Sequence, residues 1–143
     1  MILYINTADR EKIIIALRQE AIGHTQLATG KIASAKLAAV KATHLTIAKQ
    51  EFMASRSQAE KLLPAIDKLL KKNKVKLSDL RKIIVADSGG SFTSLRIGVA
   101  TANALAYALN IPIEAENKRS KVKISQGIRI VKPLYDHEPS IGR

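Results

Sequence analysis

The chain has 143 residues, enough for one domain that buries its own core without metals or disulfides. Hydrophobic residues make up 46% and aromatic residues only 3%, so the core must consist of Ile, Leu, Val and Ala. Cysteine is absent, which excludes disulfides, thiolate zinc sites and a cysteine nucleophile. The formal net charge of +12 predicts attraction to nucleic acid or anionic surfaces, and is equally typical of a solvated basic surface. No signal peptide or apolar run of ~20 residues is visible, so a cytoplasmic location without membrane contact is expected.

The first fifty residues predict a hairpin and then a region of ambiguous structure. Residues 2–7 and 12–17 are apolar runs separated by a polar turn, which indicates two antiparallel strands. Residues 44–52 alternate between apolar and polar types and favour a third strand. Residues 20–50 are rich in Ala, Thr and Lys. Long second and third strands that extend as a ribbon are expected there, with a helix over 32–40 as the competing interpretation.

A helix is predicted to begin at Ser57. The Ser57 hydroxyl can cap it, and Glu60 three residues later completes the pattern of a capping box. Leucine and isoleucine recur at helical spacing as far as Leu70, and lysines gather at the end, where the helix dipole favours them. Pro64 lies too deep for a first turn, so it either kinks the helix or begins a tighter one.

The second half of the chain predicts crossover units. Residues 83–86 are a continuous apolar strand, residues 93–109 a helix that Asn110 ends, and residues 111–115 another strand. The chain then becomes basic, with possible short strands at 122–124 and 128–131. The order strand, strand, strand, helix, strand, helix, strand predicts an α/β fold with a mixed five-stranded sheet and a short C-terminal strand or tail.

The turn between the buried strand and the second helix is the most informative segment. Its glycines let the chain reverse, its hydroxyl residues can cap the helix, and the small residues of that helix suit close packing. Free amides at a helix start attract anions, but the P-loop and GxGxxG motifs are missing, as is the GxSxG spacing of a nucleophile. Asp87 is interpreted as a turn residue that holds backbone amides, with a ligand role as the alternative. The residues of this turn are Ser88, Gly89, Gly90, Ser91, Phe92 and Thr93.

Residues 90–98, with the sequence Gly-Ser-Phe-Thr-Ser-Leu-Arg-Ile-Gly, resemble the signature of the TsaB family, also called YeaZ. Residues 2–7, 60–70 and 80–86 are similar to the family's opening strand, its first helix and the strand before the signature. The closing VKPLYDHEP resembles the family's C-terminal stretch. The resemblance covers most of the chain outside residues 20–50.

This resemblance implies the actin-like, Hsp70-like (ASKHA) fold, with residues 1–117 as the first lobe. Residues 118–143 would be a basic remnant and tail of a short form that lacks most of the second lobe. TsaB is a non-catalytic partner of the transferase TsaD, and with TsaE the system modifies adenosine 37 of tRNA to threonylcarbamoyladenosine. The resemblance therefore implies an accessory subunit with TsaD-like and TsaE-like partners, tRNA contact through the complex, and a homodimer when alone. ATP and Mg²⁺ would serve the complex, with no cofactor, metal or catalytic residue in this chain.

The resemblance also implies a partner interface formed by the two helices, over residues 57–72 and 93–109. Gly98 could equally face the chain's own sheet. The residues expected at the interface are Leu62, Ile66, Leu95, Gly98, Val99, Thr101, Ala102 and Leu105.

Departures from the family pattern weaken the case for a phosphate site. Asn6 stands where the family has Asp, and Ser88 and Ser94 stand where glycines are usual. Two other functions remain open: a small nucleotide-binding hydrolase that uses the turn at 88–93, and a stand-alone tRNA-binding homodimer. The three histidines, His24, His44 and His137, show no metal-binding spacing.

Overall fold

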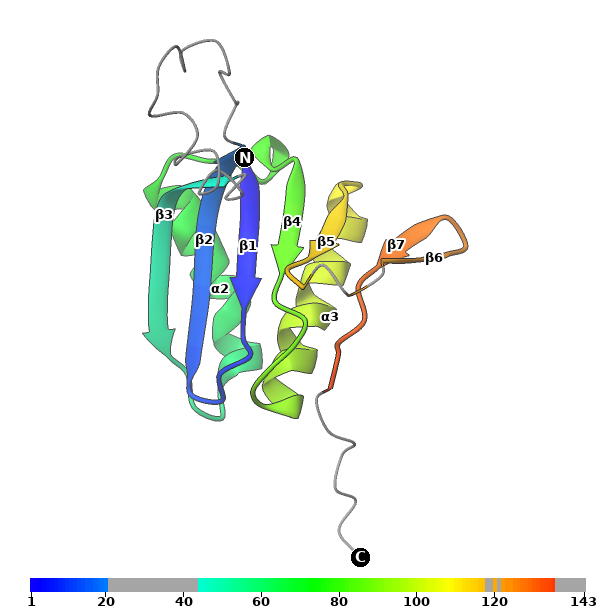
Figure 1. The fold of residues 1–143 in the computed structure, drawn as a ribbon. Coiled ribbons are helices and arrows are strands. Elements are labelled where there is room, and N and C mark those ends of the chain that lie inside the picture. Colours follow the sequence, from blue (N-terminus) through cyan, green and yellow to red (C-terminus); the bar gives the residue numbers. More distant parts are fainter. Residues whose placement is uncertain (21–43, 118–119, 121, 136–143) are drawn as a thin grey trace, which may run out of the picture.

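The computed structural model describes residues 1–20, 44–117, 120 and 122–135. Its main sheet has the strand order β3-β2-β1-β4-β5, and a two-stranded sheet pairs β6 with β7. Both long helices lie on one face of the main sheet (Figure 1). The strands are β1 (Ile2–Asn6), β2 (Lys12–Glu20), β3 (His44–Met53), β4 (Lys82–Val85), β5 (Ile113–Ala115), β6 (Lys123–Ser125) and β7 (Ile128–Ile130). The helices are α2 (Gln58–Lys72), the 3₁₀ turn η1 (Leu77–Asp79) and α3 (Phe92–Leu109).

The sheet is mixed, as predicted. Strand β1 pairs antiparallel with β2 and parallel with β4, β2 pairs antiparallel with β3, and β4 pairs parallel with β5. The first hairpin and the strand predicted over 44–52 are confirmed. Residues 21–43 lie outside the described part of the chain, so the ribbon and the helix over 32–40 both stay predictions.

The core lies between the sheet and the two helices and is aliphatic. Alternate side chains of β1, β2 and β4 point toward the helices, because successive residues of a strand face opposite sides. Leu3, Ile5, Ile15 and Val85 are fully buried there, and Leu62 of α2 packs into the same cluster. A second, smaller cluster on the other face of the sheet joins Ile2, Tyr4, Ala16 and Ile84.

The start of α2 corrects one prediction. Ser57 occupies the N-cap position, but its side chain makes no capping hydrogen bond, so the predicted capping box with Glu60 is wrong. The Ser57 backbone, with φ −129° and ψ 22°, lacks the extended ψ typical of a capping residue, and its hydroxyl lies 3.4 Å from the Ser55 carbonyl oxygen instead. The α-helix continues through Pro64 to Lys72.

The C-terminal half follows the predicted order. Asn110 ends α3 in the left-handed conformation, with φ 52°. The predicted short strands are the hairpin β6–β7, whose turn residues Gln126 and Gly127 both have positive φ. Among the described residues, no helix is long and apolar enough to cross a membrane.

Candidate functional site

The signature turn packs against the β1–β2 turn. Gly90 has φ +71°, and a Cβ atom there would lie 1.9 Å from the carbonyl oxygen of Ala8. The same carbonyl accepts a 2.8 Å hydrogen bond from the Ser91 amide. Gly90 is therefore required both by its backbone conformation and by the close approach of another chain segment.

Helix α3 begins without a side-chain cap. Ser91 is the N-cap residue, as the sequence indicated, but its hydroxyl makes no capping hydrogen bond. Ser91 acts through its backbone instead, because its carbonyl oxygen accepts a hydrogen bond from the Leu95 amide at 2.9 Å. The next residue, Phe92, stacks on Tyr135 with ring centroids 4.1 Å apart, and the Arg96 guanidinium lies 5.1 Å from the Phe92 ring centroid.

The small residues of α3 bring the helix close to the chain's own sheet. A Cβ atom at Gly98 would lie 2.2 Å from the Thr7 hydroxyl oxygen. That hydroxyl donates a 2.5 Å hydrogen bond to the Ser94 carbonyl oxygen, one turn earlier in α3. Close packing of this helix was predicted, and the segment it packs against is the end of β1.

Polar side chains follow the ends of the parallel strands, where open α/β sheets bind ligands. The Asn6 side chain accepts a 2.9 Å hydrogen bond from the Ala8 amide and donates one of 3.1 Å to the Tyr4 hydroxyl. Asp87 is fully buried, accepts a 3.1 Å hydrogen bond from the Asn117 amide and a hydrogen bond from the Ser120 hydroxyl. Asp87 thus holds one backbone amide in the described structure, and its alternative role as a ligand stays a prediction.

The Tyr4 hydroxyl donates to the Glu116 carboxylate, with both carboxylate oxygens 2.9 Å away. Burial of the ring, followed by the negative charge of Glu116, raises the pKa of Tyr4 to about 12. The Arg18 guanidinium stacks over the Tyr4 ring, 3.7 Å from its centroid. Tyr4 stays protonated at neutral pH, and its hydroxyl is a hydrogen-bond donor that links β1 to Glu116, just after β5.

The segment after β7 runs back along α3 to the signature turn. The Asn103 side chain donates to the Val131 carbonyl oxygen and accepts from the Val131 amide, both at 2.9 Å. Further on, the Leu134 amide donates to the Asp87 carbonyl oxygen at 2.6 Å, and Leu134 forms a bridge with Ser88. The sequence did not predict this contact, because the residues are far apart in the chain. The apolar residues Val131 and Leu134, which stand in a basic tail, were the sign that this segment packs against the rest of the chain.

Among the described residues, no group of three or more His, Cys, Asp or Glu side chains could hold a metal ion. His44 lies at the start of β3, with a buried Nδ1 atom that has no hydrogen-bond partner within the described part of the chain. His24 and His137 lie outside the described residues. The described turn is held by hydrogen bonds within the chain, from the Ser91 amide to Ala8 and from the Leu134 amide to Asp87.

A family model described as "TsaD: tRNA N6-adenosine threonylcarbamoyltransferase" matches residues 45–118. The chain belongs to this family. The "tRNA threonylcarbamoyladenosine biosynthesis protein TsaB" of Bacillus subtilis (strain 168) is 42% identical to it over 60 residues, covering 42% of this chain and 26% of that protein. The "tRNA N6-adenosine threonylcarbamoyltransferase" of Rhodopirellula baltica is 43% identical over 65 residues, covering 46% of this chain and 18% of that protein. The chain therefore covers less than a third of the length of either relative.

The solved structure of "YeaZ from Pseudomonas aeruginosa" superimposes with a TM-score of 0.56 and 20% identity. It covers 93% of this chain and 64% of the YeaZ chain, so the likeness of fold extends well beyond the matched sequence. The resemblance to TsaB and YeaZ seen in the signature is confirmed by these relatives.

Most of the interface residues implied by the TsaB resemblance are buried inside this chain. Thr101 and Leu105 are half-buried, and Leu105 packs against the core. The other six are buried, which corrects their expected place on the surface: Leu62, Ile66, Leu95, Gly98, Val99 and Ala102. The physical reason is that the apolar stripe of each helix packs on the five-stranded sheet of the described residues, so a partner would reach the opposite stripe.

The opposite stripe of both helices is exposed and includes apolar side chains. On α2, Leu63 is 51% exposed and Pro64 is exposed beside it. On α3, Ala100, Ala104 and Ala108 are exposed and follow one another at intervals of four, so they lie on one face of the helix. We call these five residues the outer helix face.

Proposed function

We propose that this chain is a non-catalytic subunit of the machinery that makes threonylcarbamoyladenosine at position 37 of tRNA. It binds and supports a TsaD-like transferase through the outer helix face of α2 and α3. The observation that carries the proposal is the combination of the TsaB relatives with an exposed small-residue stripe on the two helices.

The chemistry of the outer helix face supports helix-to-helix docking. Ala100, Ala104 and Ala108 are exposed and have small side chains, so a partner helix could approach this stripe of α3 closely. Leu63 is a large apolar side chain, and its removal from water would favour association. Thr101 and Leu105, which are half-buried, would form the border of this contact.

A supporting rather than catalytic role agrees with the state of the strand ends. The polar side chains of Asn6 and Asp87 are engaged within the chain, and Gly90 is pressed against the Ala8 carbonyl. These contacts occupy the side chains that would otherwise be available to a bound ligand. We therefore expect ATP and Mg²⁺ to bind elsewhere in the complex, where a TsaE-like ATPase also takes part.

The match to TsaD supports a second candidate, an enzyme that uses the signature turn to hold a nucleotide. Isothermal titration of the full chain with ATP and Mg²⁺ separates the two. The subunit proposal predicts no saturable heat up to millimolar ATP, whereas micromolar binding would favour the enzyme.

The direct test is reconstitution with the TsaD-like protein of the same organism. The two proteins should co-elute on size exclusion, and the chain should increase threonylcarbamoyladenosine formation by the transferase. In the absence of the transferase, the same face is expected to pair two copies of this chain. Addition of the transferase should therefore convert the homodimer into a heterodimer. Failure to associate and to stimulate would contradict the proposal.

A further inference from the structure

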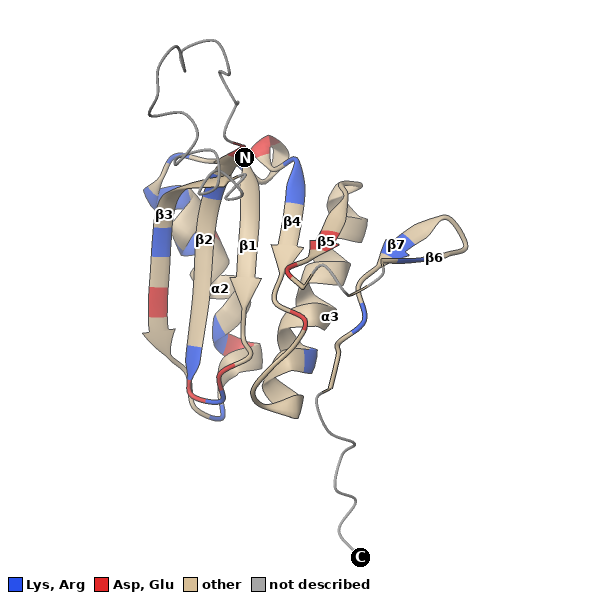
Figure 2. Cartoon of the chain, in the orientation of Figure 1, with Lys and Arg blue, Asp and Glu red and all other residues tan. Residues whose placement is uncertain are grey.

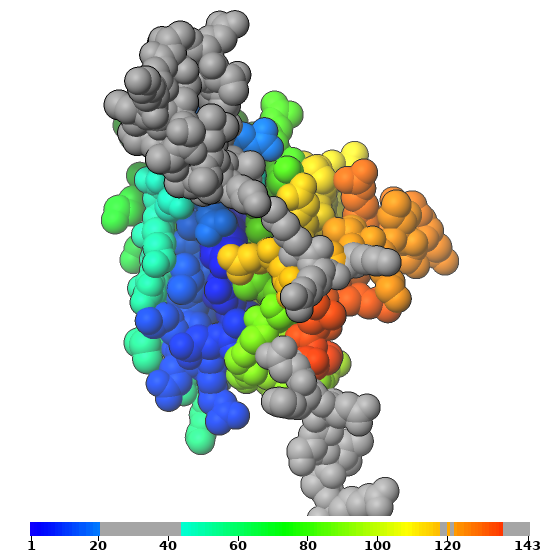
Figure 3. All heavy atoms as spheres, viewed as in Figure 1, coloured from blue at the N-terminus to red at the C-terminus, as the bar shows by residue number. Residues whose placement is uncertain are grey.

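Strand β3 is the long edge of the main sheet. It has ten residues, stands at the end of the strand order and pairs with β2 alone among the described strands. An edge strand carries a row of backbone N–H and C=O groups that face away from the sheet and can pair with another strand. In Figures 2 and 3, β3 forms one side border of the molecule. The sheet can therefore be extended by a further strand at β3.

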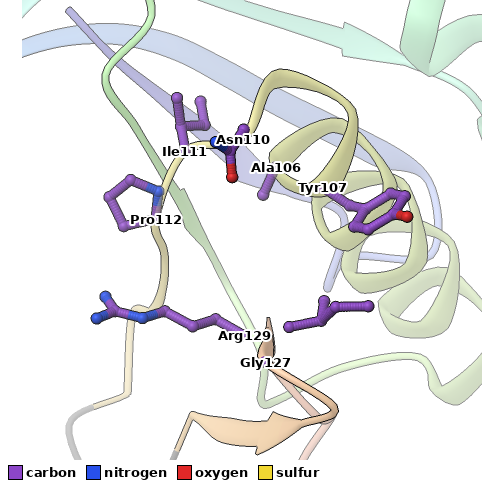
Figure 4. A pocket seen from close by; sticks show the side chains of 8 residues that line it. Ala106, Tyr107, Asn110, Ile111, Pro112, Gly127 and Arg129 are labelled. Carbon is purple, nitrogen blue, oxygen red and sulfur yellow. The ribbon is translucent and has the colours of Figure 1, made fainter.

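The opposite edge of the sheet offers less. Strand β5 has only three residues. The β6–β7 hairpin faces the start of β5 across a groove, whose lining includes Pro112, just before β5, and Arg129 of β7 (Figure 4). Within the described part of the chain, β3 is therefore the edge with room for a long ladder of backbone hydrogen bonds.

The regular part of β3 carries two opposite charges. Residues 48–53 pair with β2 in one unbroken register. Lys49 and Glu51 are the Lys, Arg, Asp or Glu residues of β3, and they appear in Figure 2 as one blue and one red band. Because they are two residues apart, both side chains point to the same face of the sheet. Their side chains are 54% and 39% exposed, so both charges are accessible at the edge.

A two-fold axis through Gln50 makes this stretch complementary to itself. When two identical strands pair antiparallel around such an axis, each residue faces the one that lies equally far on the other side of the axis. Lys49 then faces Glu51 of the second copy, and Glu51 faces its Lys49, which is favourable across a ladder. Ala48 and Phe52, which both pack against the core, also face each other, a small side chain against a large one.

Neighbouring registers lack this match. An axis through Lys49 would set the two lysines against each other, and an axis through Glu51 would do the same with the two carboxylates. An axis one residue further out on either side would leave Lys49 and Glu51 facing uncharged residues. An axis between two residues is excluded, because facing residues of an antiparallel ladder must both turn their backbone groups outward or both inward. The two charges therefore select the register centred on Gln50.

Exposed apolar side chains flank the matched stretch. Ile47 and Met53 are 48% and 60% exposed. Ile47 lies at the register shift that ends the regular part of β3, and Met53 is the last residue of the strand. In the register centred on Gln50, Ile47 of one copy faces Met53 of the other at each end of the ladder. Pairing would therefore also remove apolar surface from water.

We propose that a second copy of this chain pairs antiparallel with β3 around Gln50, so that the two main sheets join into one. The occupant is a second copy because the charges and side-chain sizes of β3 complement those of β3 itself. This contact uses none of the residues of the outer helix face. It does not rest on the proposed function, and both contacts can form on the same chain.

The first test is cross-linking by a single introduced thiol, since the natural chain has no cysteine. Gln50→Cys places two thiols on the axis, where facing Cβ atoms lie about 4.5–5.5 Å apart, close to the separation of a disulfide. Thr46→Cys is the matched control, because it is an exposed site of β3 away from the axis. On mild oxidation of the full chain, Gln50→Cys should form a covalent dimer at least about tenfold faster than Thr46→Cys, because paired thiols have a high effective concentration.

The second test reverses the charges in the Gln50→Cys chain. Lys49→Glu or Glu51→Lys alone sets like charges against each other in both symmetric pairs, so cross-linking should slow at least about tenfold. An equimolar mixture of these two variants should recover the rate, because each chain supplies the charge that the other needs. An affinity tag on one variant gives the mixed dimer a size of its own. Lost ion pairs of Glu51 with Lys12 and Lys49 inside one chain cannot explain such a recovery.

Three results would overturn the proposal: equal rates for Gln50→Cys and Thr46→Cys, single charge variants that cross-link as fast as their parent, or a mixture that stays as slow as the single variants. An excess of the TsaD-like transferase should leave the cross-link of Gln50→Cys unchanged. Loss of the cross-link under that condition would assign the edge of β3 to the transferase, and would also contradict pairing with a second copy.

Discussion

Gly98 of α3 lies so close to Thr7 at the end of β1 that a single added methyl group would fall 2.2 Å from the Thr7 hydroxyl oxygen. The hydroxyl itself is held by the Ser94 carbonyl, so it cannot easily move aside. The last glycine of the signature is thus a contact between the helix and the sheet.

Gly98→Ala should therefore lower the free energy of unfolding by about 1–3 kcal/mol, as overpacking does in other cores. Urea denaturation of the two proteins measures the difference. In a Thr7→Ala background the same change should cost less, because the obstructing hydroxyl is gone. If the two changes are simply additive, the contact does not limit residue size at position 98.

A second prediction concerns alkaline pH. Folded Tyr4 ionises near pH 12, whereas the unfolded tyrosine ionises near pH 10. Between these values the unfolded state loses its proton first, so the stabilisation from Tyr4 is complete below pH 10 and is lost as the pH rises toward 12. Urea midpoints measured from pH 9 to 12 should fall over this range. They should fall less in Tyr4→Phe, and an equal fall in both proteins would speak against the raised pKa.

A third prediction concerns the segment at 131–135. Asn103→Ala removes both hydrogen bonds to Val131 and leaves a buried amide and carbonyl without those partners, so we expect a loss of about 1–3 kcal/mol. Limited proteolysis should then cut after residue 131 faster than in the natural chain. Unchanged stability and cleavage would mean that Asn103 does not anchor this segment.

The fold was largely predictable, because strands and helices are specified by local patterns. The apolar runs of β1 and β4 and the leucine spacing of α2 led to the correct mixed sheet with two helices. Contacts between distant residues were not predictable. The sequence shows that Gly90 and Gly98 are glycines, but not that Ala8 and Thr7 approach them.

The partner-facing residues were misassigned for a related reason. Leu62 and Leu63 are adjacent and chemically identical, and helical spacing alone does not decide which one faces the sheet. The structure places Leu62 in the core and leaves Leu63 at 51% exposure. The resemblance to TsaB implies an interface on these two helices but gives no way to choose which stripe of each helix faces outward.

This pair of leucines gives a fourth prediction. Leu62→Ala should lower the free energy of unfolding by about 2–5 kcal/mol, since it leaves a cavity in the core. Leu63→Ala should change it by less than about 0.5 kcal/mol, as is usual for surface positions. Thermal denaturation of both variants is sufficient, and equal destabilisation would contradict the assigned orientation of α2.

The central claim is that the outer helix face binds the TsaD-like transferase. The measurement that tests it most directly is the dissociation constant between the two proteins by isothermal titration, for the natural chain, Ala104→Asp and Ser125→Asp. Both substitutions add one negative charge at an exposed site, but Ser125 lies on the hairpin, away from the outer helix face. We predict that Ala104→Asp weakens binding at least about tenfold, because it buries a charge in an apolar contact, while Ser125→Asp binds like the natural chain. Equal affinity of all three proteins for the transferase would contradict the claim.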